Sequence, residues 1–465
     1  MNAPTLWILV PIVVGVLLLF INNQRLLSVV GGSFAVILAV IAQFVPIEVA
    51  LKVGSYSFRI EAAYTILGRS LVIPPTEGSL LALIYGAAAL WFFGAEAAKT
   101  ATRLVPLGFI IIALLVASIA VQPFLYAALF IEMAILIAIP MLTSIYRPPG
   151  RGVVRFLIYQ TLAMPFILLA GWLLAGVEAS PGDLALTAQS AAMLGLGFAF
   201  LLAIFPLYGW IPLLIEENSP YLVGFLLWIL PAITIIFGAG FLDRYSWLRS
   251  SAQLILALRY VGLLMVVTGG AFAAFQRHLG RIMAYGSIAE TGFSLLALSL
   301  DLKLGIPILF LLIPARALGL AVWSLSLTVI KANVETMRFG PARGILRVTP
   351  LAGAGMIVAT LSTGSLPLLA GFPSRLALWE GLSRDSISAA LWMAIGIAGL
   401  LTSAVRSLAV ISMADEYTGW TFRETPTQIT MLGLGMLGLF VLGVFPQTVQ
   451  FLLADLPLMF EHLGR

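Results

Sequence analysis

The sequence predicts an all-α polytopic membrane protein with about 14 transmembrane helices, built from two inverted five-helix repeats in which helices 7 and 12 are discontinuous. Hydrophobic residues make up 61% of the chain and charged residues 10%, whereas soluble domains are roughly 45–50% apolar. Apolar stretches near the ~20 residues needed to span a bilayer follow one another along the chain. Two of them contain the motif P-L-x-x-x-x-P, from Pro206 to Pro212 and from Pro367 to Pro373.

Residues 1–100 form the first predicted region, with helices 1–3 at 5–21, 26–45 and 79–95. The longest gap between spans, 52–78, lies in this region. Residues 57–61 in that gap alternate between polar and apolar side chains, as in a short strand. No gap is long enough for a soluble domain, so we expect none.

Residues 101–245 and 246–415 are the two predicted repeats, and 416–465 holds the last helix. The first repeat contains helices 4–8, at 104–122, 124–145, 156–177, 188–211 and 221–242. The second contains helices 9–13, at 252–275, 282–300, 304–330, 351–372 and 386–413. Helix 14 is predicted at 427–453.

The two proline motifs fall in helices 7 and 12. A proline removes a backbone donor and clashes with the preceding turn, so two prolines at this spacing predict a broken helix. Helices 7 and 12 differ by an odd number of crossings and therefore run in opposite directions, as an inverted repeat requires. Since prolines are common in membrane helices, a chance match is the alternative.

Charged residues inside predicted spans are the candidates for a proton pathway: Glu132, Glu290, Arg316, Arg375 and Arg406. A charge at the bilayer centre costs about 2.5–3.5 kcal/mol on insertion scales, so each one predicts a partner or an aqueous path. For Arg375 and Arg406 the alternative is a side chain that reaches the interface from a helix end. We expect Glu132 to face the protein interior beside a basic or polar partner, and Glu216 and Glu217 to lie in a solvated loop.

Several kinds of site are not expected. The chain has no cysteine, and its two histidines are His278 and His462, so the ligands of an iron–sulfur, haem or zinc site are scarce and we expect none of these sites. No glycine-rich phosphate loop follows a strand. We therefore predict no cofactor, no metal, no nucleic-acid partner and no catalytic centre of its own.

Orientation follows from the basic residues. The net charge is +5, and more lysines and arginines fall in the predicted cytoplasmic loops than in the external ones when both termini lie outside. We therefore expect an integral protein of the cell inner (plasma) membrane, surrounded by the lipid bilayer, with both termini outside.

Four segments carry a family resemblance. QRHLGRIMAYGSIAETGFSLLAL (276–298) resembles a signature of the antiporter-like proton-translocating subunits of respiratory complex I, group 4 hydrogenases and Mrp antiporters. FIEMAILIAIPML (130–142) resembles the family segment that holds the membrane glutamate, here Glu132. FPLYGWIPLLIEENSPYLVGFL (205–226) and LPLLAGFPSRLALWEGL (366–382) resemble the two broken helices, which places Arg375 at the basic position of helix 12. The resemblance covers roughly residues 80–415.

The chain departs from the family at the positions on which proton transfer relies. The family lysine of helix 7 corresponds to about Leu201, and no Lys, Arg or His occurs between Arg155 and Arg244. In helix 11, Arg316 stands near the family histidine and Leu320 near the lysine. A buried lysine can alternate between charged and neutral forms, whereas arginine stays protonated.

The resemblance implies an antiporter-like membrane subunit of a complex I-like or hydrogenase-like redox-driven proton pump, non-catalytic itself and bound to other membrane subunits. The transported ion would be the proton or Na+. Two alternatives stay open: a non-pumping structural subunit of such a complex, and a stand-alone cation/proton secondary transporter. Because the first repeat lacks lysine and histidine, we expect weak or absent proton conduction there.

Overall fold

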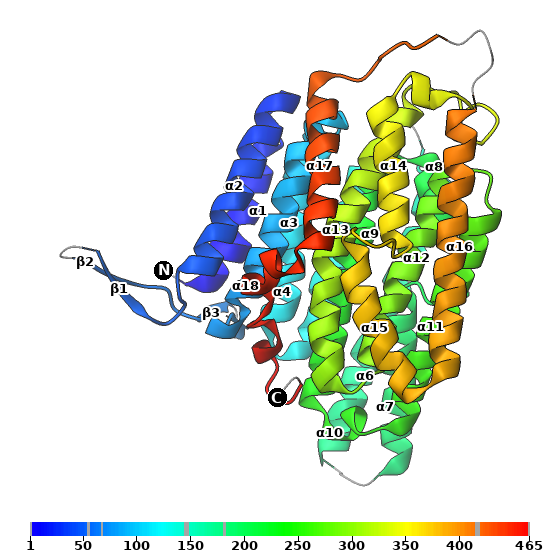
Figure 1. Cartoon of the computed structure of the whole chain (residues 1–465). Coiled ribbons are helices and arrows are strands. Elements are labelled where there is room, and N and C mark those ends of the chain that lie inside the picture. The colour runs from blue at the N-terminus through cyan, green and yellow to red at the C-terminus, as the bar shows by residue number, and fades with distance from the viewer. Residues whose placement is uncertain are drawn as a thin grey trace.

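The computed structural model describes residues 2–53, 56–66, 68–143, 148–179, 183–413 and 419–463. Long helices run side by side in one bundle (Figure 1). In that view the marked C-terminal end lies toward the lower end of the bundle, where helix α10 is also found, and the N-terminal end lies at the left, near the strands. The predicted boundary between 415 and 416 lies outside the described residues.

The first region contains a π-helical turn at Thr5–Leu9 followed by α1 (Val10–Leu18), α2 (Gln24–Phe44) and α3 (Gly78–Ala97). Between α2 and α3 the chain forms two antiparallel hairpins rather than one short strand. The first pairs β1 (Ala50–Val53) with β2 (Tyr56–Arg59), and the second pairs β3 (Ala63–Ile66) with β4 (Arg69–Val72). The predicted strand at 57–61 thus overlaps β2, but β2 begins one residue earlier and ends two residues earlier. Strand β4 also pairs with β5 (Val121–Gln122), which ties the loop to the end of α4.

The second region holds α4 to α9, and α10 follows directly after its predicted end at 245. Their bounds are α4 (Ala101–Ala120), α5 (Ala127–Leu142), α6 (Arg151–Ala179), α7 (Leu184–Leu201), α8 (Trp210–Glu217), α9 (Pro220–Arg244) and α10 (Ser246–Arg249). Asp183 caps α7 by accepting the backbone N–H groups of Ala185 and Leu186. Short 3₁₀ turns lie at Pro75–Glu77, Phe124–Tyr126 and Leu207–Gly209.

The remaining regions hold α11 to α18. Their bounds are α11 (Ala252–Phe275), α12 (Leu279–Leu298), α13 (Leu302–Lys331), α14 (Pro350–Thr363), α15 (Gly371–Asp385), α16 (Ile387–Ser412), α17 (Pro426–Val444) and α18 (Gln450–Leu453). Ser251, Asp301, Ser386 and Thr425 each accept a backbone N–H as N-caps of their helices. Further 3₁₀ turns are Ile345–Arg347, Pro446–Val449 and Leu456–Met459.

Within the described residues, 11 helices are long and apolar enough to cross a membrane. The segments Thr5–Leu18 and Pro350–Thr363 are apolar but shorter. Helix α12, which carries Arg281 and Glu290, is not among the 11. The fold is therefore that of a polytopic helical membrane protein, while the number 14 and the inverted repeat stay predictions.

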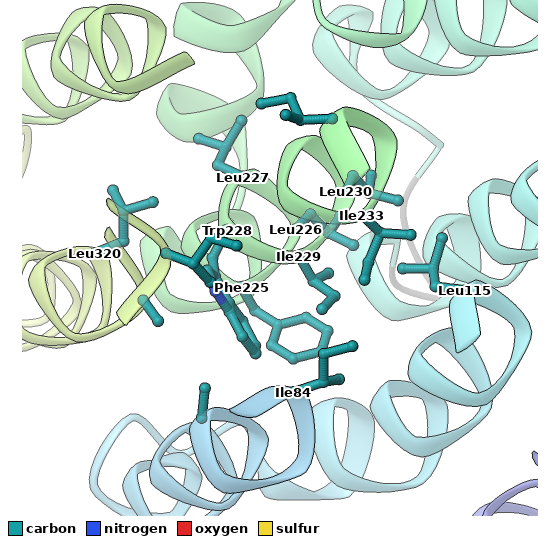
Figure 2. Close-up of a cluster of buried hydrophobic side chains, with 14 of the residues drawn as sticks. Ile84, Leu115, Phe225, Leu226, Leu227, Trp228, Ile229, Leu230, Ile233 and Leu320 are labelled. Atoms are coloured by element: carbon teal, nitrogen blue, oxygen red, sulfur yellow. The ribbon is translucent and has the colours of Figure 1, made fainter. Parts of the chain in front are cut away.

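Helix α9 lies inside the bundle, with 94% of its most apolar stretch buried. Its middle, from Phe225 to Ile233, packs among apolar side chains of neighbouring helices that include Ile84 of α3, Leu115 of α4 and Leu320 of α13 (Figure 2). The indole of Trp228 also stacks on that of Trp91, with ring centroids 6.2 Å apart. The side chains of this part of α9 are apolar, while its Leu227 carbonyl oxygen accepts a hydrogen bond from Arg316 of α13.

The two predicted discontinuities are present. Helix α7 ends at Leu201 and α8 begins at Trp210; α14 ends at Thr363 and α15 begins at Gly371. Pro212 and Pro373 are each the third residue of the helix after the break, where a missing backbone N–H removes no intrahelical bond.

Both breaks begin with the same helix cap. Ala203 and Ser365 adopt left-handed φ angles of 50° and 61°. The next residue then donates five positions back, from Ile204 N to Ala199 O (2.9 Å) and from Leu366 N to Leu361 O (3.0 Å). This six-to-one bond defines a Schellman cap. The cap, rather than the proline, therefore ends each helix.

Candidate functional site: a buried charged cluster between helices α12, α13 and α15

The centre of the cluster is an ion pair between Arg375 of α15 and Glu290 of α12. Arg375 Nη2 donates to Glu290 Oε1, and the two side chains are only 2% and 5% exposed. Nη1 of the same arginine donates to the carbonyl oxygen of Ser362 at 3.0 Å. The guanidinium also lies over the ring of Phe293, 4.8 Å from its centroid. Two of the predicted pathway residues thus meet directly.

The second helix break positions Arg375. Because α14 ends at Thr363, the Ser362 carbonyl oxygen lies in its last turn, where it also accepts the backbone N–H of Ser365 at 3.0 Å, and a cation is favourable at this end of a helix. Gly371 makes this approach possible. A Cβ at Gly371 would lie 1.8 Å from Arg375 Nη1 and 2.0 Å from Ser362 O. The backbone of the break and the ion pair therefore depend on each other.

Arg316 of α13 lies in the same buried region and is 4% exposed. Its Nη2 donates to the carbonyl oxygen of Leu227 in α9 at 2.8 Å and to Thr291 Oγ1 in α12 at 3.0 Å. Arg316 is within electrostatic reach of both Glu290 and Arg375. It thus connects the cluster with the central helix of the first predicted repeat.

Glu132 of α5 is separate from this cluster. Its Oε1 accepts a hydrogen bond from Thr161 Oγ1 of α6 at 2.8 Å, so a polar partner lies on a neighbouring helix, as predicted. Its other oxygen, Oε2, is buried and has no partner among the described residues. A narrow void lined by Glu132, Gln160 and Leu201 has no room for a water molecule. The leucine at the family's lysine position therefore lies beside the glutamate.

Arg406 of α16 is also outside the cluster. Its Nη1 donates to the carbonyl oxygen of Ala274 in the last turn of α11, and its guanidinium lies 5.7 Å from the ring centroid of Phe339. A cation that binds the final carbonyls of a helix acts as a cap. The geometry brings Arg406 to a helix end and not to Glu290.

A second charged group occurs at one end of the bundle, and it corrects one expectation. Glu216 and Glu217 are the last residues of α8 rather than loop residues, and of the two only Glu217 is exposed as expected. Arg281 of α12 holds Glu216 through Nη2 at 2.6 Å and Nε at 3.0 Å. Glu217 Oε2 accepts the backbone N–H of Gly152 in α6 at 2.7 Å. The donors, Gly152 and Arg281, come from the first turns of α6 and α12, and the sequence alone does not show that these helices lie beside α8.

Lys331 and His278 complete this end group. Lys331 Nζ donates to the carbonyl oxygens of Glu216 (3.1 Å) and Asn218 (2.7 Å), where α8 ends. His278 is the N-cap of α12, and its Nδ1 accepts the Arg281 backbone N–H at 3.3 Å. Burial lowers the pKa of His278, and the adjacent Glu216 partly opposes that effect. The pKa of Glu216 lies below its usual value: burial raises it, but the hydrogen bond and charge of Arg281 outweigh that.

Curated proteins are similar to this chain in sequence. NAD(P)H-quinone oxidoreductase chain 4 1 of Synechococcus sp. (strain JA-2-3B'a(2-13)) is 28% identical over 284 residues, which cover 56% of this chain and 53% of the relative. Chain 4 2 of Trichodesmium erythraeum is 27% identical over 304 residues, 61% of this chain and 54% of the relative. The chain spans about half the length of the curated relatives it matches.

Solved structures share the fold over nearly the full length. A chain of respiratory complex I from Thermus thermophilus matches with a TM-score of 0.77 at 21% identity, covering 99% of this chain and 100% of that one. A chain of the archaeal membrane-bound sulfane sulfur reductase matches with a TM-score of 0.81 at 16% identity, covering 98% of this chain and 97% of that one. A chain of the Mrp complex from Dietzia sp. DQ12-45-1b matches with a TM-score of 0.79 at 15% identity, covering 99% of this chain and 97% of that one.

The family assignment rests on the membrane domain itself. Residues 153–402, more than half of the chain, match the sequence model for the transmembrane domain described as NADH:quinone oxidoreductase/Mrp antiporter. This stretch includes both helix breaks and the Glu290–Arg375 pair. The chain therefore belongs to the NADH:quinone oxidoreductase/Mrp antiporter membrane family.

Proposed function

We propose that this chain is an antiporter-like membrane subunit of a complex I-like or hydrogenase-like redox-driven assembly, bound to other membrane subunits, in which the first half conducts protons weakly or not at all. The observation that carries the second part is the pairing of Glu132 with Thr161, beside a leucine and a void without room for water. A carboxyl group in that setting has no base to receive its proton.

The apolar centre supports the same conclusion. A proton crossing the first half needs titratable groups or water at hydrogen-bonding intervals. Helix α9 offers apolar side chains from Phe225 to Ile233 (Figure 2). Lysine, arginine and histidine are absent from 156–243 of the sequence. A proton route in the first half would therefore have to pass apolar packing.

The charged side chains of the second half are suited to setting a fixed electric field rather than to relaying protons. Glu290 is held by Arg375, and Arg316 is hydrogen-bonded to a backbone carbonyl. Arginine does not release its proton in proteins, so neither guanidinium can pass one on. This supports a second candidate: a non-pumping structural subunit that keeps its neighbours in register. Under this second candidate, other subunits of the assembly would transport the coupled ion, which is the proton or Na+.

The assembly would lie in the cell inner (plasma) membrane with both termini outside. Gly152 contacts Glu217, and Arg281 and Lys331 contact Glu216, so two of the predicted cytoplasmic cations, Arg281 and Lys331, lie at the same end of the bundle. The positive-inside rule assigns that end to the cytoplasm. Reporter fusions at each terminus would test the orientation.

Pumping stoichiometry in vesicles that contain the native assembly tests the proposal. Glu132→Gln should leave protons pumped per electron pair unchanged. Leu201→Lys, which places a base beside Glu132, should leave the native ratio or raise it, because it restores the missing partner. Glu380→Gln, which removes a carboxylate that is 59% exposed, is the matched control. Loss of pumping in Glu132→Gln with electron transfer intact would overturn the proposal.

A further inference from the structure

A small cavity of about 20 Å³ lies where the first helix break meets the second predicted repeat. Its walls come from the end of α7, the start of α8, the middle of α9, and the facing sides of α12 and α13. The polar residues that line it are Gln160, Trp210, Ser287, Thr291 and Arg316. A water-sized particle needs roughly 10–15 Å³, so the cavity admits a particle of about that size and excludes phosphate or sulfate.

The hydrogen-bonding groups of the lining are unbalanced in favour of donors. Nε and Nη1 of Arg316 and Nε1 of Trp210 are buried and have no acceptor among the described residues. Arg316 is 4% exposed and Trp210 also 4%. Buried N–H groups without an acceptor are costly, and those of a guanidinium more so. The lining therefore requires an acceptor.

The charge of the cluster points the same way. Its buried members carry two guanidinium groups, those of Arg316 and Arg375, and one carboxylate, that of Glu290. Glu290 is bound to Arg375, so the formal charge on Arg316 has no ionic partner of its own. An uncompensated charge in a membrane interior is strongly unfavourable. A ligand with one negative charge would balance the cluster.

A water molecule fits this cavity less well than an anion does. Water accepts about two hydrogen bonds and must donate two. The hydroxyl groups of Ser287 and Thr291 already donate to backbone carbonyls, to Ala284 O at 2.8 Å and Ser287 O at 3.3 Å. The unpartnered side-chain atoms of the lining are all donors. A monatomic anion accepts from all three N–H groups and supplies the missing charge.

We propose that this cavity is a binding site for a small monovalent anion, a halide such as chloride, held by Arg316 and Trp210 at the α7–α8 break. The site does not depend on whether the chain conducts protons. Its anion would join Arg316 of the second half to the first residue of α8 in the first half. The bound anion therefore fixes the broken helix against the charged cluster.

Thermal unfolding of the full chain in detergent tests the site. At equal ionic strength, chloride and bromide should raise the unfolding midpoint by about a few degrees over gluconate, because a ligand that binds the folded state stabilises it. Trp210→Phe should weaken the halide half-saturation about tenfold or more, since it removes one hydrogen bond to a charged ligand. Arg316→Met should abolish the halide effect.

Trp91→Phe is the matched control, because Trp91 is buried, its Nε1 has no acceptor among the described residues, and it does not line the cavity. It should keep the wild-type halide response. Anomalous scattering from bromide-grown crystals should show bromide beside Arg316, a readout that stands even if Arg316→Met fails to fold. Equal midpoints in halide and gluconate, bromide at another place, water alone in the cavity, or an unchanged response in Trp210→Phe would overturn the proposal.

Discussion

Three charged side chains far apart in the sequence share one buried site. Glu290 and Arg375 are 85 positions apart and form an ion pair, and Arg316 lies within their electrostatic reach. The cost of burying charge in a bilayer was enough to select these residues from the sequence. Their pairing was not predictable, because it depends on where the break lets α15 approach α12. The same reasoning selected Arg406, which caps α11 instead.

Removing Glu290 should destabilise the chain more than removing Arg375. Glu290→Gln leaves two buried guanidinium groups without a carboxylate, so we expect a loss of about 3–5 kcal/mol in the free energy of unfolding. Arg375→Gln should cost less, because Arg316 remains within reach of Glu290. Glu380→Gln, which breaks an exposed pair, should change stability by less than about 1 kcal/mol. Denaturant titration of the full chain in detergent measures all three. A larger loss in Arg375→Gln would show that Arg316 does not compensate.

Helix breaks show what a sequence pattern can and cannot locate. The paired prolines predicted the interrupted helices, but α7 ends five residues before Pro206 and α14 four before Pro367. The stops are left-handed residues at Ala203 and Ser365, which have no compositional signal because neither is glycine. The hairpins between α2 and α3 were also underestimated, since strand pairing depends on partners that one alternating segment does not reveal. The same cap ends the helix at both breaks, and the inverted repeat stays a prediction.

Close contact between α11 and α16 depends on glycine. A Cβ at Gly270 would lie 2.0 Å from Gly396 O, whereas a Cβ at Gly195 of α7 would have no heavy atom within 4 Å. Gly270→Ala should therefore force the two helices apart and cost about 1–3 kcal/mol or more. Gly195→Ala should stabilise the chain by roughly 0.5–1 kcal/mol, because alanine is the better helix former. Unfolding midpoints of the two variants give the comparison. Equal effects would mean that the helices adjust without strain.

The two predicted halves are joined differently at the two ends of the bundle. Near α10, an apolar cavity of about 190 Å³ lies between α7 and α9 on one side and α11 and α12 on the other. At the opposite end, α8 of the first half is bound to α12 and α13 of the second through Arg281 and Lys331. Polar contacts therefore supply the directional connection between halves, and these contacts respond to pH.

The free energy of unfolding should decrease as the pH is lowered, over a window set by His278. Its neutral Nδ1 caps α12, and Glu216, Arg281, Lys331 and Arg338 are the charged groups around it. Burial lowers its pKa below 6.5, so the unfolded chain takes up the proton more readily than the folded one. The stabilisation is complete above pH 6.5 and is lost as the pH falls from there through the lower folded pKa. The contribution of Glu216 is lost only below pH 4.5, because its folded pKa is also lowered.

Two variants of His278 separate the titration from the cap. His278→Asn keeps a side chain that caps helices well and does not titrate, so the decline between pH 7 and 5 should become shallower while stability at pH 7 is retained. His278→Ala should lose about 1 kcal/mol at pH 7, since the cap is gone, and should show the same shallow pH profile as His278→Asn. Unfolding midpoints of the full chain at half-unit steps of pH provide the measurement. If His278→Asn kept the wild-type slope, the connection between the halves would titrate through another group, and the end cluster would hold α8 independently of the histidine cap.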